Sequence, residues 1–304
     1  MNLIIVHGGV ETGTGPPYLE ALGKAALAGY KALSKSLLDA AEETIKILED
    51  DPLFNAGYGS VLNYDGEVEM DAAVMDGRTS GFGAVAAITG VAHPISVARL
   101  VLEKTSHVLL AGPGATKFAR SQGFPEVNCV YPEMLAAWKR AREKIALSGS
   151  SRACPYTGLD DPGERACDTV GCVIFDRGML AAASSTGGSF LKMPGRVGDT
   201  PVPGGGIFAS GNCAVVCTGL GEAFIETLTA KYVDSLVRDG IHPREAAERA
   251  MKRLHRLKKG AVGGLVAVDS KMRYGAAYNC RRFPVAVFEN GVVAGDYKPV
   301  KIKE

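Results

Sequence analysis

The feature that most constrains this 304-residue chain is an abrupt change of pattern shortly after its midpoint. Residues 148–165 are rich in turn-forming residues and carry no hydrophobic periodicity, which is typical of a linker. Soon afterwards, Thr169 to Phe175 and Met179 to Ser185 form two β-rich segments joined by Asp176-Arg177-Gly178, which predicts a β-hairpin. The chain must therefore fold so that a strand beginning with a threonine follows directly from a linker.

The remaining segments alternate between strand and helix patterns, which indicates a layered α/β protein. Before the linker, we expect strands at Leu3 to Val6, Val68 to Met75, Phe82 to Thr89 and Val108 to Ala111, and helices at Leu22 to Leu33, Leu38 to Leu48, Ile95 to Glu103 and Glu133 to Leu147. After the hairpin and a glycine-rich loop, we expect strands at Ala214 to Cys217, Gly264 to Asp269, Tyr274 to Tyr278 and Val285 to Glu289, and helices at Glu222 to Arg238 and Pro243 to Leu257.

Composition narrows the class of partner. The 34 basic residues nearly cancel the 33 acidic ones, so the chain has no global field that would recruit nucleic acid or an anionic membrane. No apolar run approaches the ~20 residues of a membrane span, and the first residues show no signal peptide, so we expect a cytoplasmic protein. The seven cysteines are scattered and form no ligand-spaced set with the histidines, which predicts reduced thiols and no metal chemistry. A small neutral or zwitterionic molecule is the expected partner.

Thr169 offers unusual chemistry if the peptide bond that joins it to Asp168 is broken. The cut would leave a free α-amine beside the threonine hydroxyl, and an α-amine has a pKa of about 7.7 to 8.0, so part of it is an unprotonated base at neutral pH. One residue would then supply both nucleophile and base, whereas the amide nitrogen of an uncut chain supplies no base. On this motif alone, an ordinary strand threonine is the better explanation.

Three later features add to the case. Thr186 ends the second strand of the hairpin, where it can lie beside the start of the first. Arg196 and Asp199 stand three residues apart on a loop held by glycine and proline, and they match the carboxylate and ammonium of an amino acid, although a local ion pair between them is an equal alternative. Thr218 and Gly219 occupy a strand-to-helix turn that could form an oxyanion hole or be an ordinary βα turn.

Together with these loops, three earlier motifs resemble the plant-type L-asparaginase/isoaspartyl peptidase family of N-terminal nucleophile hydrolases. They are Val6-His7-Gly8-Gly9, the segment 48–60 and Glu69-Met70-Asp71-Ala72, and the match spans nearly the whole chain. The resemblance implies a four-layer αββα sandwich made from a precursor that cuts itself between Asp168 and Thr169. Residues 1–168, which end in a flexible linker at about 148–168, would form the α subunit and residues 169–304 the β subunit, together one structural domain. The expected assembly is a homodimer of cleaved protomers, (αβ)2.

The same resemblance implies a role for each candidate residue in hydrolysing the side-chain amide of L-asparagine, β-aspartyl dipeptides, or both. The nucleophile is Thr169, Thr186 orients its amine, Thr218 and Gly219 form the oxyanion hole, Arg196 and Asp199 grip the substrate, and Gly221 and Asn55 line the pocket. No organic cofactor is implied. A structural Na⁺ would be held by backbone carbonyls of Leu48, Glu49, Asp51, Phe54, Ala56 and Tyr58.

Three other functions are compatible with parts of the sequence. A glycosylasparaginase-like amidase shares the superfamily, but the expected cytoplasmic location argues against it. A nucleotide-binding enzyme would explain the glycine-rich segment 8–15, which however lacks both a GxGxxG register and a GK[ST] ending. A processed, non-catalytic homologue would keep the fold without turnover.

Overall fold

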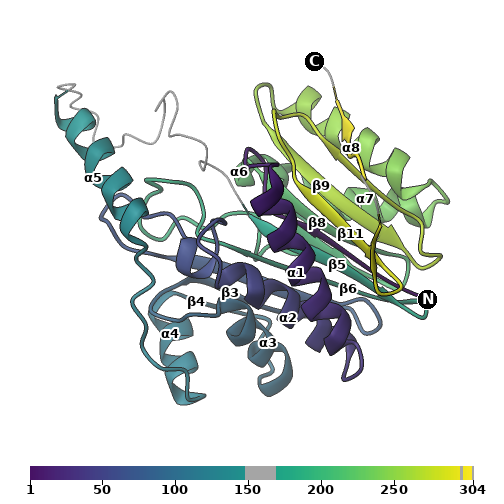
Figure 1. The fold of residues 1–304 in the computed structure, drawn as a ribbon, viewed down its shortest axis with the longest axis horizontal. Coiled ribbons are helices and arrows are strands. Elements are labelled where there is room, and N and C mark those ends of the chain that lie inside the picture. Colours follow the sequence, from purple (N-terminus) through teal and green to yellow (C-terminus); the bar gives the residue numbers. More distant parts are fainter. Residues whose placement is uncertain (148–168, 295–296, 303–304) are drawn as a thin grey trace.

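The computed structural model describes residues 1–147, 169–294 and 297–302, and it has four layers. Two stacked β-sheets lie between two layers of helices (Figure 1), which confirms the expected αββα sandwich. The larger sheet has eight strands in the order β12-β11-β1-β5-β6-β2-β3-β4, and the smaller has five in the order β13-β10-β9-β8-β7. The expected linker lies outside the described residues.

In the larger sheet, strands from the two sides of the linker are interleaved. β5 pairs with β1 on one side and β6 on the other, and β6 pairs in turn with β2, all antiparallel. The strands of this sheet are β1 (Asn2–His7), β2 (Met70–Asp76), β3 (Gly81–Ile88), β4 (Leu109–Ala111), β5 (Val170–Asp176), β6 (Met179–Thr186), β11 (Val285–Glu289) and β12 (Val292–Ala294). Residues 1–147 and 169–304 therefore complete one another's hydrogen-bond ladders.

The smaller sheet packs face to face on the larger one. Alternate side chains of a strand point to opposite faces, and β5 therefore contributes to two cores. Cys172 and Ile174 face the helices, whereas Val173 and Phe175 enter the core between the sheets. Every residue of β5 is buried, which explains its unbroken apolar sequence. The strands of the smaller sheet are β7 (Ile207–Ala209), β8 (Cys213–Gly219), β9 (Gly263–Asp269), β10 (Tyr274–Tyr278) and β13 (Val300–Lys301).

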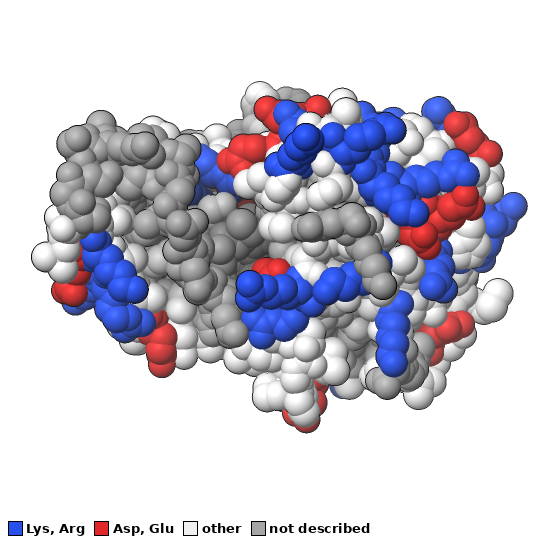
Figure 2. Space-filling model, turned by 90° about the horizontal axis from the view of Figure 1, so that it is seen from above, with Lys and Arg blue, Asp and Glu red and all other residues white. Residues whose placement is uncertain are grey.

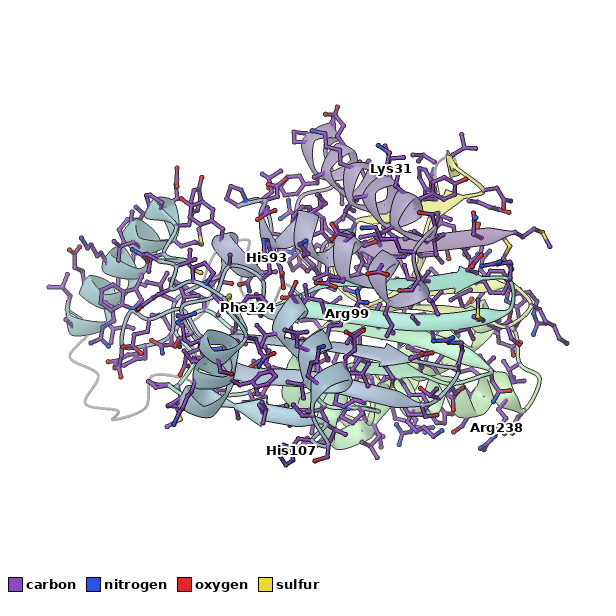
Figure 3. The ribbon with its side chains drawn as sticks, turned by 90° about the horizontal axis from the view of Figure 1, so that it is seen from below. Lys31, His93, Arg99, His107, Phe124 and Arg238 are labelled. Atoms are coloured by element: carbon purple, nitrogen blue, oxygen red, sulfur yellow. The ribbon has the colours of Figure 1, made fainter. Side chains whose placement is uncertain are left out.

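Helices cover the outer faces of both sheets. The larger sheet carries α1 (Pro16–Ala32), α2 (Leu37–Glu49), α3 (Pro94–Lys104) and α4 (Gly112–Ser121), and the smaller carries α6 (Gly221–Thr227), α7 (Thr229–Arg238) and α8 (Pro243–Leu257), while α5 (Pro132–Leu147) projects beyond the sheet edge (Figure 1). Arg99 of α3, labelled in Figure 3, joins two helices of the first layer by donating to Asp39 and Glu42 of α2, each at 2.7 Å.

The single helix expected at Glu222 to Arg238 is wrong, because the structure breaks it at Leu228. This residue has a φ of +48°, outside the helical region. The next amides bond to another segment: Ala230 N donates to Gly205 O at 3.1 Å and Lys231 N to Gly204 O at 3.0 Å. Because these carbonyls replace those of the preceding turn, α7 starts afresh on the glycine-rich loop. The sequence patterns also missed α4, β7, β12 and β13.

The surface agrees with the balanced composition. On the face drawn in Figure 2, groups of basic side chains have acidic ones beside them. Within the described ranges, no helix is both long and apolar enough to cross a membrane. The described cysteines, at 129, 172, 213, 217 and 280, are free and buried.

Candidate active site

Thr169 is the first described residue after position 147, and it immediately precedes β5. It is buried, with 5% of its surface exposed. Val170 pairs with Ser185, so one further step along the hairpin brings Thr169 opposite Thr186, and Thr186 pairs on its other side with Asp71 of β2. Directly opposed residues of antiparallel strands point to the same face. The three side chains therefore form one row across the end of the sheet.

The hairpin is closed by a tight turn that sets this register. Asp176 pairs with Met179, which leaves a two-residue loop of Arg177 at φ +49° and Gly178 at φ +85°. Both left-handed values match a type I′ turn, the form that suits the twist of a hairpin. At the other end, the Oγ of Thr186 accepts the Gly188 N–H at 2.9 Å, which fixes its position beside Thr169.

A small pocket lies beside this row of residues. It brings together five of the residues singled out from the sequence, although they come from four separate segments. The lining residues are Thr169, Thr186, Gly188, Ser189, Arg196, Gly198, Asp199 and Gly219.

Arg196 supplies the positive charge of the pocket, but its ion-pair partner is Glu222 and not Asp199. Its Nε and Nη2 donate to the two Glu222 carboxylate oxygens at 2.8 Å each. Burial raises the pKa of the Glu222 carboxyl, but its hydrogen bonds to Arg196 outweigh this and hold the pKa below the ordinary value. One edge of the guanidinium is thus occupied, and Nη1 remains on the other edge for a bound carboxylate.

Asp199 supplies a buried carboxyl group. Burial raises the pKa of its carboxyl to about 7, against the opposing attraction of Arg196. Its Oδ2 has no hydrogen-bond partner among the described residues. A buried carboxylate oxygen without a donor is a strong site for an ammonium group. Gly221 is not among the lining residues but packs closely on both charged residues, because a Cβ there would lie 2.9 Å from Arg196 Nη2 and 3.1 Å from Asp199 Oδ1.

Gly219 and Thr218 form the turn at the end of β8. Gly219 has a φ of +136°, and a Cβ there would lie 2.3 Å from the carbonyl oxygen of Val262, so only glycine fits. Gly219 lines the pocket, whereas Thr218 lies immediately behind it and is fully buried. In the described part of the chain, no group bonds to Thr218 Oγ, which leaves this hydroxyl available as a donor.

Asn55 lies behind the pocket wall instead of lining it. Its Oδ1 accepts Val61 N–H at 2.9 Å, and its Nδ2 donates to Gly188 O at 2.7 Å. Gly187 packs so closely on Asn55 that a Cβ would lie 2.4 Å from Oδ1. Asn55 therefore shapes the turn that holds Thr186.

The segment 48–58 folds back on itself through the short 3₁₀ helix η1 (Gly57–Gly59). Gly57 has a φ of +54°, and a Cβ there would lie 2.3 Å from Glu49 O. The carbonyls of Leu48, Asp51 and Ala56 accept backbone N–H groups at 3.4, 3.1 and 3.2 Å. Because a carbonyl oxygen has two lone pairs, one such hydrogen bond does not exhaust its capacity as an acceptor. Among the described side chains, no cluster of His, Cys, Asp or Glu could hold a metal ion.

Comparison with known proteins decides the family. The family model described as "Asparaginase" matches residues 1–295. The chain belongs to the asparaginase family. It is 46% identical over 299 residues to the plant-type L-asparaginase of Pyrococcus abyssi, covering 96% of this chain and 98% of that protein. It is also 39% identical over 299 residues to the mouse isoaspartyl peptidase/L-asparaginase, covering 95% and 88%. It is 42% identical over 269 residues to the isoaspartyl peptidase of Salmonella typhimurium, covering 86% and 84%.

The asparaginase-family site contains two acidic residues that the sequence motifs did not assign. Glu222 pairs with Arg196, and Asp71 stands in the row with Thr169 and Thr186. Asp71 belongs to the motif Glu69 to Ala72, and Glu222 is the first residue of the helix expected at Glu222 to Arg238. Their roles depend on which loop lies opposite them, which spacing along the chain does not reveal.

Proposed function

We propose that the protein is a self-processing N-terminal nucleophile hydrolase that cleaves the side-chain amide of L-asparagine and of β-aspartyl dipeptides, releasing aspartate. The supporting observation is one pocket that holds a threonine at the start of a strand, an arginine and a buried aspartate. The relatives described above are named for the same two activities, L-asparaginase and isoaspartyl peptidase.

In the proposed reaction, the free amine of Thr169 takes the proton from its own Oγ, which attacks the amide carbonyl of the substrate. The Gly219 N–H and the Thr218 hydroxyl stabilise the negative charge on the carbonyl oxygen. The amine then returns the proton to the leaving group, which departs as ammonia or as the free amine of an amino acid. Water attacks the resulting Thr169 ester by the same route and releases aspartate.

The charges of the pocket suit an amino acid. Arg196 would bind the α-carboxylate through the edge that Glu222 leaves open, and Asp199 would accept hydrogen bonds from the α-ammonium. Because Glu222 already neutralises one positive charge, the pocket favours a zwitterion over a simple anion. These contacts bind only the aspartyl part of the substrate, so the site would accept either ammonia or an amino acid as the leaving group.

Cleavage between Asp168 and Thr169 would produce the free α-amine of Thr169. Asp168 lies outside the described residues. Thr169 Oγ would attack the Asp168 carbonyl in an N-to-O acyl shift, and water would then hydrolyse the ester. We further propose a homodimer of cleaved protomers and a cytoplasmic location, the latter supported by the free buried thiols. The carbonyls of segment 48–58 would hold a structural Na⁺.

Incubation of purified, aged protein with L-asparagine, a β-aspartyl dipeptide and a glycosylated asparagine tests this function. Ammonia and free amino acids should appear with the first two substrates. Cleavage of the glycosylated asparagine alone would support a glycosylasparaginase instead. Absence of turnover with all three would support a non-catalytic homologue.

A further inference from the structure

Two buried carboxylates, two residues apart in sequence, hold the loop that carries Arg196 and Asp199. Glu69, immediately before β2, accepts the Gly195 N–H with both of its oxygens at 3.0 Å. Asp71, the second residue of β2, accepts the Gly198 N–H at 3.1 Å. Gly195 directly precedes Arg196, and Gly198 directly precedes Asp199. Each carboxylate is therefore one peptide unit away from a substrate-binding residue.

Asp71 needs both of its oxygens. Its Oδ2 receives Gly198 N–H, while its Oδ1 receives the N–H of Ala87 at 2.8 Å. Ala87 belongs to a β-bulge where the β2–β3 register shifts, and its φ is +46°. The bulge turns this amide out of the ladder and towards the carboxylate. A fully buried carboxylate with two backbone donors is a rigid anchor for the loop.

Lys192 completes the arrangement from the start of the same loop. Its side chain is buried, with 3% of the residue exposed, and its Nζ donates to the Glu69 carbonyl at 2.8 Å. Burial lowers the pKa of this ammonium, and the nearby charge of Asp71 opposes that shift. Residues 192–198, which form no strand, are thus held to Glu69 and Asp71 at three points: Lys192, Gly195 and Gly198.

We infer that Glu69 and Asp71 are positioning residues that act separately on the two substrate-binding side chains. Glu69 positions Arg196, and Asp71 positions Asp199. The inference rests on the proposed function, because it assigns the carboxylate of the substrate to Arg196 and its ammonium to Asp199. Neither Glu69 nor Asp71 lines the pocket. They act through the loop backbone and not by touching the ligand.

The test compares two ligands that differ only in the ammonium group. L-aspartate needs both Arg196 and Asp199, whereas succinate has no amine and needs only Arg196. Dissociation constants are measured by calorimetry on protein whose cleavage has been checked by mass spectrometry, and KM and kcat for L-asparagine are measured alongside. Asp76→Asn is the matched control, since this buried aspartate lies at the far end of β2 and bonds to Arg78.

Asp71→Asn keeps the shape but replaces one acceptor by an NH₂ group, so one backbone N–H faces a donor. It should weaken L-aspartate binding about 10- to 100-fold and succinate binding by less than about threefold, with a rise in KM that exceeds the fall in kcat. Glu69→Leu should weaken both ligands by a similar large factor. Glu69→Gln keeps one acceptor for the single Gly195 N–H and should restore binding to within about threefold of wild type.

Equal losses of L-aspartate and succinate in Asp71→Asn would overturn the inference, and so would wild-type binding in Glu69→Leu. If Asp71→Asn fails to fold or to cut itself, the comparison of Glu69→Leu with Glu69→Gln still decides whether a carboxylate beside β2 positions the loop. A wild-type protein without amidase activity would overturn the proposed function itself. An active wild type whose variants bind as it does would overturn only this inference.

Discussion

At the scale of single residues, the pocket depends on which of two carboxylates, Glu222 or Asp199, pairs with Arg196. Arg196 is bound along one edge by Glu222, and Asp199 is left buried with an oxygen that no described group satisfies. Residue types and spacing predicted an arginine–aspartate grip, and both residues do line the pocket. The ion pair with Glu222 was not predictable, because it joins positions 26 residues apart that only the βα turn brings together.

Arg196→Lys should raise KM for L-asparagine about 10- to 100-fold while self-cleavage survives. Lysine keeps the charge but cannot bind Glu222 and a substrate carboxylate with two separate edges, and a hydrogen bond to a charged group is worth about 1.5 to 3 kcal/mol. Steady-state kinetics measure the effect. Arg177→Lys is the control, because Arg177 also donates through Nε and Nη2 to a carboxylate, one oxygen of Asp176, but in a turn away from the pocket. An unchanged KM in Arg196→Lys would remove Arg196 from the substrate site.

Binding of L-aspartate should weaken as pH falls below about 7, the pKa to which burial raises the Asp199 carboxyl. The ammonium of the ligand needs the ionised carboxylate, so protonation of Asp199 opposes binding by up to about tenfold per pH unit. Succinate lacks the ammonium and should not lose affinity in this way. Titration calorimetry between pH 5.5 and 8.5 measures both ligands. Parallel pH dependence for the two would show that Asp199 does not hold the amine.

At the scale of elements, most helices and strands were predictable from the sequence because their hydrophobic patterns are strong. The apolar run of β5 and the amphipathic spacing of α2 and α8 decide these segments locally. The patterns missed α4, which has few apolar residues to mark its buried side, and the break at Leu228, where carbonyls of Gly204 and Gly205 take over from the preceding turn. The β-bulge at Ala87 is likewise set by a carboxylate on the neighbouring strand.

The segment 48–58 should make the melting temperature depend on sodium. A cation that binds only the folded state stabilises it as its concentration rises, so NaCl should raise the melting temperature above that in choline chloride of equal ionic strength. Gly57→Ala should abolish the difference, because its Cβ would lie 2.3 Å from Glu49 O. Gly123→Ala, which has a left-handed φ of +89° in open space, is the control for backbone strain. Equal melting temperatures of wild type in both salts would exclude a sodium site.

At the scale of the whole molecule, a cut at the start of β5 need not separate the two parts. β5 lies between β1 and β6, and β11 pairs with the other side of β1, so residues 169–304 supply strands on both sides of β1. The sequence indicated one αββα sandwich through its family resemblance. The interleaving itself could not be predicted from periodicity, since strand order depends on contacts between distant segments.

Self-cleavage should make Thr169 the N-terminal nucleophile, and the mass of aged, purified protein tests this. Under denaturing conditions, we expect two chains, residues 1–168 and residues 169–304, with Thr169 first in N-terminal sequencing of the second chain. Native mass spectrometry should show both fragments in one particle, and Thr169→Ala should remain a single folded chain without amidase activity. An intact wild-type chain that still hydrolyses L-asparagine, with no fragment beginning at Thr169, would show that Thr169 is not an N-terminal nucleophile.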